Sequence, residues 1–141
     1  MSEALRLEFN VAGNNFVSAG SASDEVKKTL KMLGIGAQFI RKVAIAMYEG
    51  EINMVIHAGG GRAIVDIFPE KIKIVLQDEG PGIPDIELAM KEGYSTASDN
   101  IRDLGFGAGM GLPNMKKYTD EFLIESEVGV GTTVTMVVNF Q

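Results

Sequence analysis

A glycine series with alternating spacing, at residues 105–111, has the composition of an anion-binding loop. Its four glycines permit positive φ angles and let backbone N–H groups approach a ligand without a Cβ in the way. A helix-forming run at residues 112–118 follows directly, so several N–H donors and the positive end of a helix dipole are aimed at one spot. That spot suits a chain of phosphates. A flexible loop preceding a helix is the alternative that the series by itself leaves open.

The glycine series does not match the common phosphate-binding motifs. Walker A requires a Gly-Lys pair, and the chain contains none. The Rossmann pattern requires a third glycine in the region where Met110 and Leu112 stand. The His-Arg-Asp and Asp-Phe-Gly motifs of protein kinases are absent as well. A nucleotide bound by this series is therefore held by a different scheme.

Three polar residues recur at intervals of four in an otherwise apolar predicted helix: Glu49, Asn53 and His57. This spacing places them on one face of the helix. A carboxylate can accept a proton from a hydroxyl group, and an amide oxygen is a hard ligand suited to Mg²⁺. A solvated stripe along a buried helix is the alternative. His57 stands at the predicted helix end, where a cation is favoured, so we interpret it as a cap.

A second acidic residue, Asp78, stands between a predicted strand and a Gly-Pro-Gly turn at residues 80–82. An acid in this position can accept a hydrogen bond from a ligand's amino group, while the glycines let the ligand lie against the backbone. Gly131 and Thr132 form a similar short motif near the end of the chain. Ordinary turns are the alternative for both motifs, because proline and glycine are the commonest turn residues.

Hydrophobic periodicity predicts the elements that must position these residues. The predicted strands cover residues 5–11, 63–68, 71–76, 121–127 and 132–140, and the predicted helices cover about 16–33, 37–57, 85–91 and 111–119. The intervening residues 92–104 are polar and aperiodic, which predicts a mobile loop. The order of elements predicts an α/β (α+β) two-layer sandwich, in which helices cover one face of a mixed, largely antiparallel sheet. We expect residues 1–141 to form a single domain.

Composition excludes several classes of function. The chain has 141 residues, enough for one domain with a substantial core, and its net charge of −6 argues against direct nucleic-acid binding. It contains no cysteine, which excludes disulfides and Cys-ligated zinc, and a Ser-His triad would have to use the only histidine as its base. No apolar run reaches the roughly 18 residues of a membrane span, and the N-terminus lacks a signal peptide. We therefore expect a cytoplasmic protein that binds no membrane.

Taken in chain order, these motifs resemble the N, G1, G2 and G3 boxes of the GHKL ATPases. That superfamily has the Bergerat ATP-binding fold and includes histidine kinases, gyrase, Hsp90 and the anti-sigma-factor serine kinases. The matching motifs are Glu49-x-x-x-Asn53, Asp78-x-Gly80-x-Gly82, the glycine series and Gly131-Thr132. Residues 92–97, 109–116 and 120–122 look most like the switch serine kinase branch. Such kinases phosphorylate Ser or Thr on a STAS-domain partner and then switch partners.

The resemblance implies a role for each matching residue. Glu49 would be the general base, and Asn53 would bind both the nucleotide and Mg²⁺. Asp78 would bind the adenine amino group of ATP, with Thr132 beside the base. The remaining implied cofactor-binding residues are Gly80 and Gly82 in the pocket floor, and Gly105, Gly107, Gly109, Met110, Gly111 and Leu112 around the phosphates. Residues 92–104 would be a lid, with Arg102 as a candidate cation for phosphoryl transfer.

Three functions follow as hypotheses. The first is an ATP- and Mg²⁺-dependent protein serine/threonine kinase that acts on a STAS-domain protein in a bacterial stress or sigma-factor pathway. The second is an anti-sigma factor whose main output is inhibitory binding to a sigma factor. The third is a nucleotide-gated binding module without transfer activity, against which the presence of Glu49 argues. A downstream phosphatase is a further partner implied by the resemblance.

Overall fold

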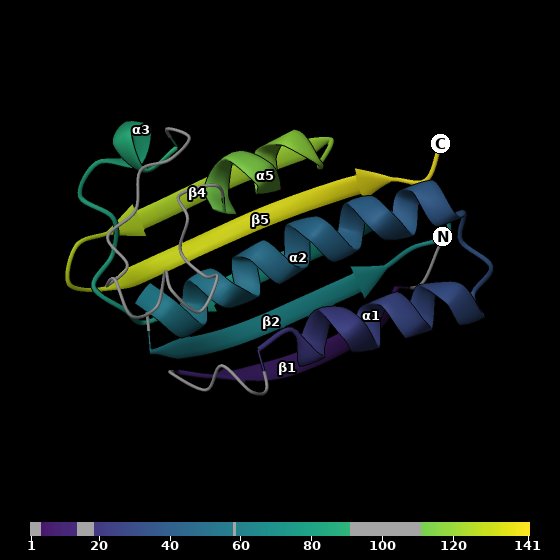
Figure 1. Ribbon diagram of the computed structural model, residues 1–141, viewed down its shortest axis with the longest axis horizontal. Helices are drawn as coiled ribbons and strands as arrows, with labels where there is room; N and C mark the ends of the chain where they lie inside the picture. Colours follow the sequence, from purple (N-terminus) through teal and green to yellow (C-terminus); the bar gives the residue numbers. More distant parts are fainter. Residues whose placement is uncertain (1–3, 14–18, 58, 91–110) are drawn as a thin grey trace, which may run out of the picture.

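The computed structural model describes residues 4–13, 19–57, 59–90 and 111–141, which form a layer of helices on one face of a sheet (Figure 1). The elements run in the order β1 (Leu5–Ala12), α1 (Ser21–Met32), α2 (Ala37–His57), β2 (Gly60–Ile67), β3 (Lys71–Asp78), α3 (Ile86–Ala89), α5 (Gly111–Lys117), β4 (Glu121–Glu127) and β5 (Gly131–Asn139). The predicted α/β fold with helices on one face of the sheet is confirmed.

The five strands lie in the spatial order β1-β2-β3-β5-β4, and the four pairings described are all antiparallel. The two central strands, β3 and β5, therefore come from distant parts of the chain. Their pairing places Asp78 opposite Thr132 at one end of the sheet. Two of the motif residues are thus brought together by strand register alone.

The core lies between the sheet and the helices. In β3, Ile72, Ile74 and Leu76 are buried, while Lys73 and Gln77 are exposed on the opposite face. This alternation follows from the two-residue repeat of a strand with one covered face. Helix α2 lies across the middle of the covered face between α1 and α5 (Figure 1). Its central position makes α2 the element that carries polar residues into the interior.

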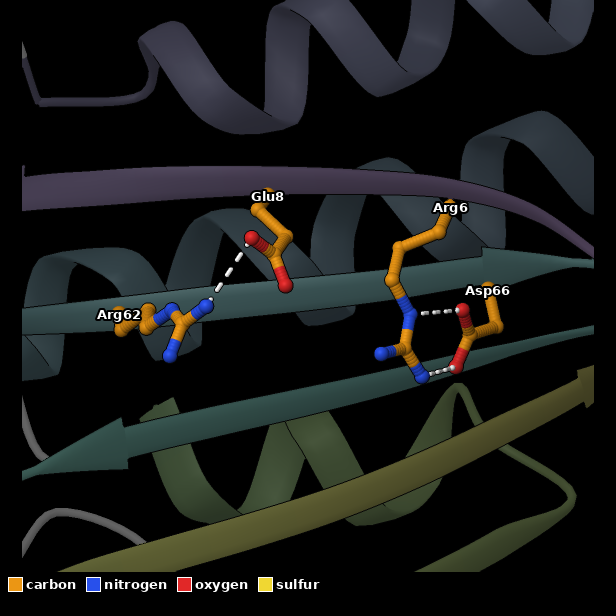
Figure 2. A network of polar contacts seen from close by, with 4 residues as sticks. All are labelled: Arg6, Glu8, Arg62 and Asp66. Atoms are coloured by element: carbon orange, nitrogen blue, oxygen red, sulfur yellow. Dashed lines mark hydrogen bonds and ion pairs between the residues drawn. The ribbon is translucent and has the colours of Figure 1, made fainter.

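The uncovered face of the sheet carries charged pairs between neighbouring strands. Figure 2 shows Arg6 on β1 bound to Asp66 on β2 through two contacts of 2.8 and 3.0 Å, and Arg62 bound to Glu8 at 2.9 Å. The hydrogen bond from Arg6 lowers the pKa of Asp66. Stabilisation from this pair is present above the unfolded-state pKa of Asp66 and is lost as the pH falls through its lowered value. These pairs fix the register of the edge strand β1.

Two predicted helix boundaries are wrong. The first helix was expected from about residue 16, but α1 begins at Ser21, because Gly20 takes a left-handed conformation with φ 95°. The helix expected at residues 85–91 is a single turn, Ile86–Ala89, whose first turn is capped by the Asp85 carboxylate at 3.0 Å from the Leu88 N–H. Within the described ranges, no helix is long and apolar enough to cross a membrane.

Candidate functional site

Glu49 and Asn53 lie one turn apart on α2, and both side chains are half-buried. Gly50, between Glu49 and Glu51, is buried. A Cβ at Gly50 would collide with the Leu76 side chain of β3 and would lie 3.2 Å from Met115 Sδ of α5. Glycine at this position therefore lets α2 pack closely on both neighbours, and close packing holds Glu49 in the gap between α2 and α5.

The amide of Asn53 lies directly against the first residue of α5. A Cβ built on Gly111 would be 3.0 Å from both Oδ1 and Nδ2 of Asn53, and 3.3 Å from Cγ. Such distances are tighter than most contacts to a Cβ, so a side chain at residue 111 would require the Asn53 amide to shift by a few tenths of an ångström. The last glycine of the series thus lies beside the candidate metal ligand, as a shared phosphate and metal site requires.

The surroundings of the Glu49 carboxylate change its pKa. Burial raises the pKa of Glu49, and a hydrogen bond from the side chain of Asn114 partly offsets this rise. A base with a raised pKa has a stronger tendency to accept a proton at neutral pH. Asn114, on α5, was not singled out as a site residue from the sequence. Its signal was its position three residues after the last glycine of the series.

Asp78, at the end of β3, organises the turn that follows it. Its Oδ1 accepts hydrogen bonds from the Gly80 N–H at 3.0 Å and from the Thr132 N–H of β5 at 3.1 Å. Its Oδ2 accepts none from the described residues, which leaves an acceptor at the sheet end. A Cβ at Gly61 would lie 3.2 Å from the Asp78 Cβ and 2.7 Å from the Met54 sulfur. This close approach brings the end of the sheet against the half of α2 that carries Asn53.

Thr132 is held by a hydroxyl network that sequence reasoning missed. Ser126 Oγ accepts from the Ile83 N–H at 2.7 Å, donates to the Gly131 carbonyl at 3.1 Å, and lies 2.9 Å from Thr132 Oγ1. A hydroxyl has one proton. Because Ser126 gives its proton to Gly131, Thr132 is the donor between the two hydroxyls. Thr132 therefore keeps its lone pairs for a ligand that donates hydrogen bonds.

Close backbone contacts join the two glycine turns around Asp78. Gly82 has φ 80°, and a Cβ there would meet the carbonyl of Glu127 at the end of β4. Gly131 has φ 148°, and a Cβ there would meet the carbonyl of Asp78. The Gly129 N–H also donates to the Pro81 carbonyl at 2.9 Å. The region beside Asp78 is thus made of backbone packed on backbone, with no room for side chains at Gly82 or Gly131.

The structure describes eight of the twelve site residues expected from the sequence, and the contacts above join them in two groups, one around Asn53 and one around Asp78. Those it describes are Glu49, Asn53, Asp78, Gly80, Gly82, Gly111, Leu112 and Thr132. Leu112 is half-buried at the start of α5 and packs against the core. The others expected, namely Gly105, Gly107, Gly109 and Met110, together with Arg102 and the proposed lid at 92–104, lie outside the described residues.

A buried acid on α2, Glu51, supports the site and was not anticipated from the sequence. Its side chain is 1% exposed, and its carboxylate accepts the N–H groups of Gly20 at 2.8 Å, Ala22 at 3.3 Å and Ser23 at 2.9 Å. These N–H groups begin α1, which has no side-chain cap of its own. Glu51 therefore caps α1 from another helix and joins α1 to the helix that carries Glu49 and Asn53.

Replacing Glu51 should destabilise the fold. We expect Glu51→Ala to lower the free energy of unfolding by about 3 kcal/mol, since three N–H groups at a helix start lose a charged acceptor in a buried place. Urea denaturation measures this change. Glu25→Ala, which removes an exposed acid from α1, the helix that Glu51 caps, is the matched control and should change stability by less than about 0.5 kcal/mol. Equal stability of the two variants would contradict the capping role.

Known proteins resemble this chain in sequence. Residues 40–141 match the family described as histidine kinase-, DNA gyrase B-, and HSP90-like ATPase. The chain is 34% identical over 112 residues to the serine/threonine-protein kinase RsbT of Bacillus subtilis, covering 77% of this chain and 78% of that protein. It is 32% identical over 140 residues to an anti-sigma F factor of Geobacillus stearothermophilus, covering 95% of this chain and 90% of that protein.

Solved structures contain the same fold. The crystal structure of the RsbU and RsbW domains of a Mycobacterium tuberculosis protein matches with a TM-score of 0.64 at 15% identity. The match covers 95% of this chain but only 32% of that longer chain. At this identity the likeness concerns the fold alone. It places the helices and the five-stranded sheet in a known architecture.

Proposed function

Because this chain belongs to the histidine kinase-, DNA gyrase B- and HSP90-like ATPase family, we propose that it is an ATP- and Mg²⁺-dependent protein serine/threonine kinase of the cytoplasm. The observation that carries the proposal is the arrangement around α2. Glu49, half-buried with a raised pKa, stands one turn from Asn53, whose amide lies against Gly111. A protein that used nucleotide only for binding would have no need of a tuned base beside that amide.

The residues around Asp78 fit an adenine ring. Asp78 Oδ2 accepts a hydrogen bond from the amino group of adenine, because Oδ1 already accepts hydrogen bonds from the N–H groups of Gly80 and Thr132. Thr132 lies beside the same edge of the ring with its lone pairs free to accept. Gly82 and Gly131 bring backbone to the floor of the pocket without side chains in the way. A purine with an exocyclic amino group satisfies this acceptor set, whereas one with a carbonyl at that position does not.

The residues of α2 and α5 fit the phosphate end. When bound, ATP supplies the phosphoryl group and Mg²⁺ neutralises its charge. Asn53 would hold the metal through its amide oxygen, with the backbone of Gly111 beside it. Leu112, at the start of α5, would lie beside the phosphates, and the family resemblance implies that the glycine series would hold them. Glu49 accepts the proton of the substrate hydroxyl, and Asn114 keeps the Glu49 carboxylate oriented through its hydrogen bond.

The substrate that we propose is a serine or threonine of a STAS-domain regulatory protein. The similarity to the kinase RsbT and to anti-sigma F factors favours a regulator that phosphorylates one partner and exchanges it for another. The second candidate function is an anti-sigma factor that binds and inhibits a sigma factor, which the similarity over almost the whole chain to such a factor favours. A downstream phosphatase is a further candidate partner.

Transfer of a labelled γ-phosphate tests this proposal. The purified chain is incubated with γ-labelled ATP, Mg²⁺ and each of a panel of STAS-domain proteins, and sigma factors are tested separately for co-elution. We expect at least one STAS protein to be labelled on Ser or Thr in a reaction that EDTA stops. A chain that labels no STAS protein but binds a sigma factor tightly would establish the second candidate instead.

A further inference from the structure

The charges of this chain are strongly segregated. Residues 26–48 carry five cations and no acid, whereas the rest of the chain carries eight cations and all 19 acids. This stretch spans most of α1, the connection to α2 and the first half of α2. A protein with a net charge of −6 thus contains one strongly basic region. Charge segregation of this kind shapes which partners approach and from which side.

The basic residues are exposed on two helices, α1 and α2, that follow one another in the chain. The C-terminal end of α1 and the start of α2 meet at one end of the molecule, joined by a connection of a few residues (Figure 1). The hairpin surface consists of the exposed side chains Lys27, Lys31, Met32, Leu33, Arg41 and Lys42. None of its four cations forms an ion pair with another described residue; Lys28, beside them, pairs with Asp24 at 3.3 Å.

Two large apolar side chains lie within this basic surface. Met32 is 87% exposed and Leu33 is 52% exposed, at the last turn of α1. Single exposed apolar residues are common on proteins and need no explanation. Here, however, they are adjacent in sequence and directly follow Lys31, at the end of a helix that also carries exposed Lys27 and Lys28. Apolar anchors inside a charged rim are the composition of a protein-binding surface.

The hairpin surface is continuous with the approach to Glu49. Lys42 precedes Glu49 by seven residues, so both lie on the same side of α2, about 10 Å apart along the helix axis. Lys42 is exposed, and Glu49 is half-buried where α2 meets α5. A folded partner that covers the hairpin surface would therefore also reach over the proposed base.

We propose that the hairpin surface docks the protein substrate through an acidic face that carries an apolar residue. The inference rests on the proposed kinase function and adds how the substrate is recognised. Complementary charge selects the partner, and Met32 with Leu33 anchors it. A protein fits better than nucleic acid or an anionic membrane, because the rest of this chain carries a formal charge of −11 and would repel an extended polyanion.

Charge reversal at two positions tests the docking surface. The double variant Lys31→Glu/Lys42→Glu is compared with the control variant Lys71→Glu/Lys73→Glu. The control changes the net charge equally, but on β3, the middle strand of the sheet. The substrate is the STAS-domain protein that the wild-type chain phosphorylates. We expect the hairpin variant to raise the KM for that protein about tenfold or more, with kcat and the KM for ATP unchanged. The control should change each value less than about twofold. The neutral pair Lys31→Gln/Lys42→Gln should give an intermediate KM.

Each outcome is decisive. An equal KM for the hairpin and control variants overturns the docking surface while leaving the kinase activity established. Loss of binding to phosphatidylglycerol vesicles or to duplex DNA in the hairpin variant, with an unchanged KM, overturns it in favour of a lipid or nucleic-acid partner. If the wild type phosphorylates no STAS-domain protein, the kinase proposal fails first and the docking proposal fails with it. A KM that rises with salt in the wild type, and less steeply in the hairpin variant, supports the surface.

Discussion

Glu49→Ala is expected to reduce phosphoryl transfer to a STAS-domain protein by about 10²–10⁴-fold while Mg-ATP binding stays near the wild-type value. The carboxylate lies half-buried between α2 and α5 with a raised pKa, where it can accept the proton of an attacking hydroxyl. It is separate from the residues around Asp78 that fit the adenine base. Removing it should therefore affect the chemical step and leave nucleotide affinity unchanged. Single-turnover transfer and calorimetric titration with ATP measure the two effects independently.

The isosteric Glu49→Gln variant separates chemistry from folding. Because burial raises the pKa of Glu49 in the folded state, the ionised carboxylate lowers the stability of the fold relative to the protonated form. The stability that Glu49 contributes is present below its unfolded-state pKa and is lost as the pH rises through the raised folded value. At neutral pH, Glu49→Gln should therefore unfold no more easily than the wild type. A variant that has lost transfer but is equally stable identifies the base.

Two further measurements complete the test. The acid limb of the pH profile for kcat/KM should lie above the ordinary range of a glutamate and should disappear in Glu49→Gln. Asn53→Ala should fail differently, by weakening Mg²⁺-dependent nucleotide binding as well as transfer, since the amide is the proposed metal ligand. Full transfer activity in Glu49→Ala would show that the kinase mechanism is wrong.

The sequence predicted the parts of this molecule that follow from local pattern. Strand alternation and helical spacing identified the five strands and α2, and the spacing of Glu49 and Asn53 placed both on one face of that helix. The close packing of α2 on β3 and α5 depends on Gly50, which the pattern does not distinguish from any helical glycine. The pairing of Asp78 with Thr132 depends on the order of strands in the sheet. The family resemblance placed both residues in one site, and periodicity by itself could not.

The features that the sequence did not predict are contacts between distant segments. Glu51, two residues from the candidate base, is buried and caps α1, a role that helical spacing does not indicate. The start of α1 was predicted too early, because the cap comes from α2 and no local residue marks it. Ser126 lies on a strand with alternating polarity, and only the folded sheet brings it to Thr132. Such residues are recognised by what they contact, and the sequence order does not contain those contacts.

Asp78→Asn is expected to weaken ATP binding by on the order of 100-fold while leaving the fold intact, because a charged acceptor for the adenine amino group is lost. The fold should survive, since an asparagine Oδ1 can still accept the N–H groups of Gly80 and Thr132 at 3.0 and 3.1 Å. The new amide nitrogen then points a donor at the amino group of the base, where an acceptor is needed. Calorimetric titration measures the affinity. Glu79→Gln, the same change at the exposed neighbouring residue, should have no effect.

Changing the nucleobase of the nucleotide gives a sharper test of the adenine assignment. The wild type should prefer ATP over inosine triphosphate, which carries a carbonyl in place of the adenine amino group and offers no donor to Asp78. Asp78→Asn should reduce or invert this preference, because its amide can donate to the inosine carbonyl. Weakened ATP binding with an unchanged preference would mean that Asp78 acts only by holding the Gly80–Gly82 turn against β5. Unchanged affinity for ATP would show that the adenine site lies elsewhere.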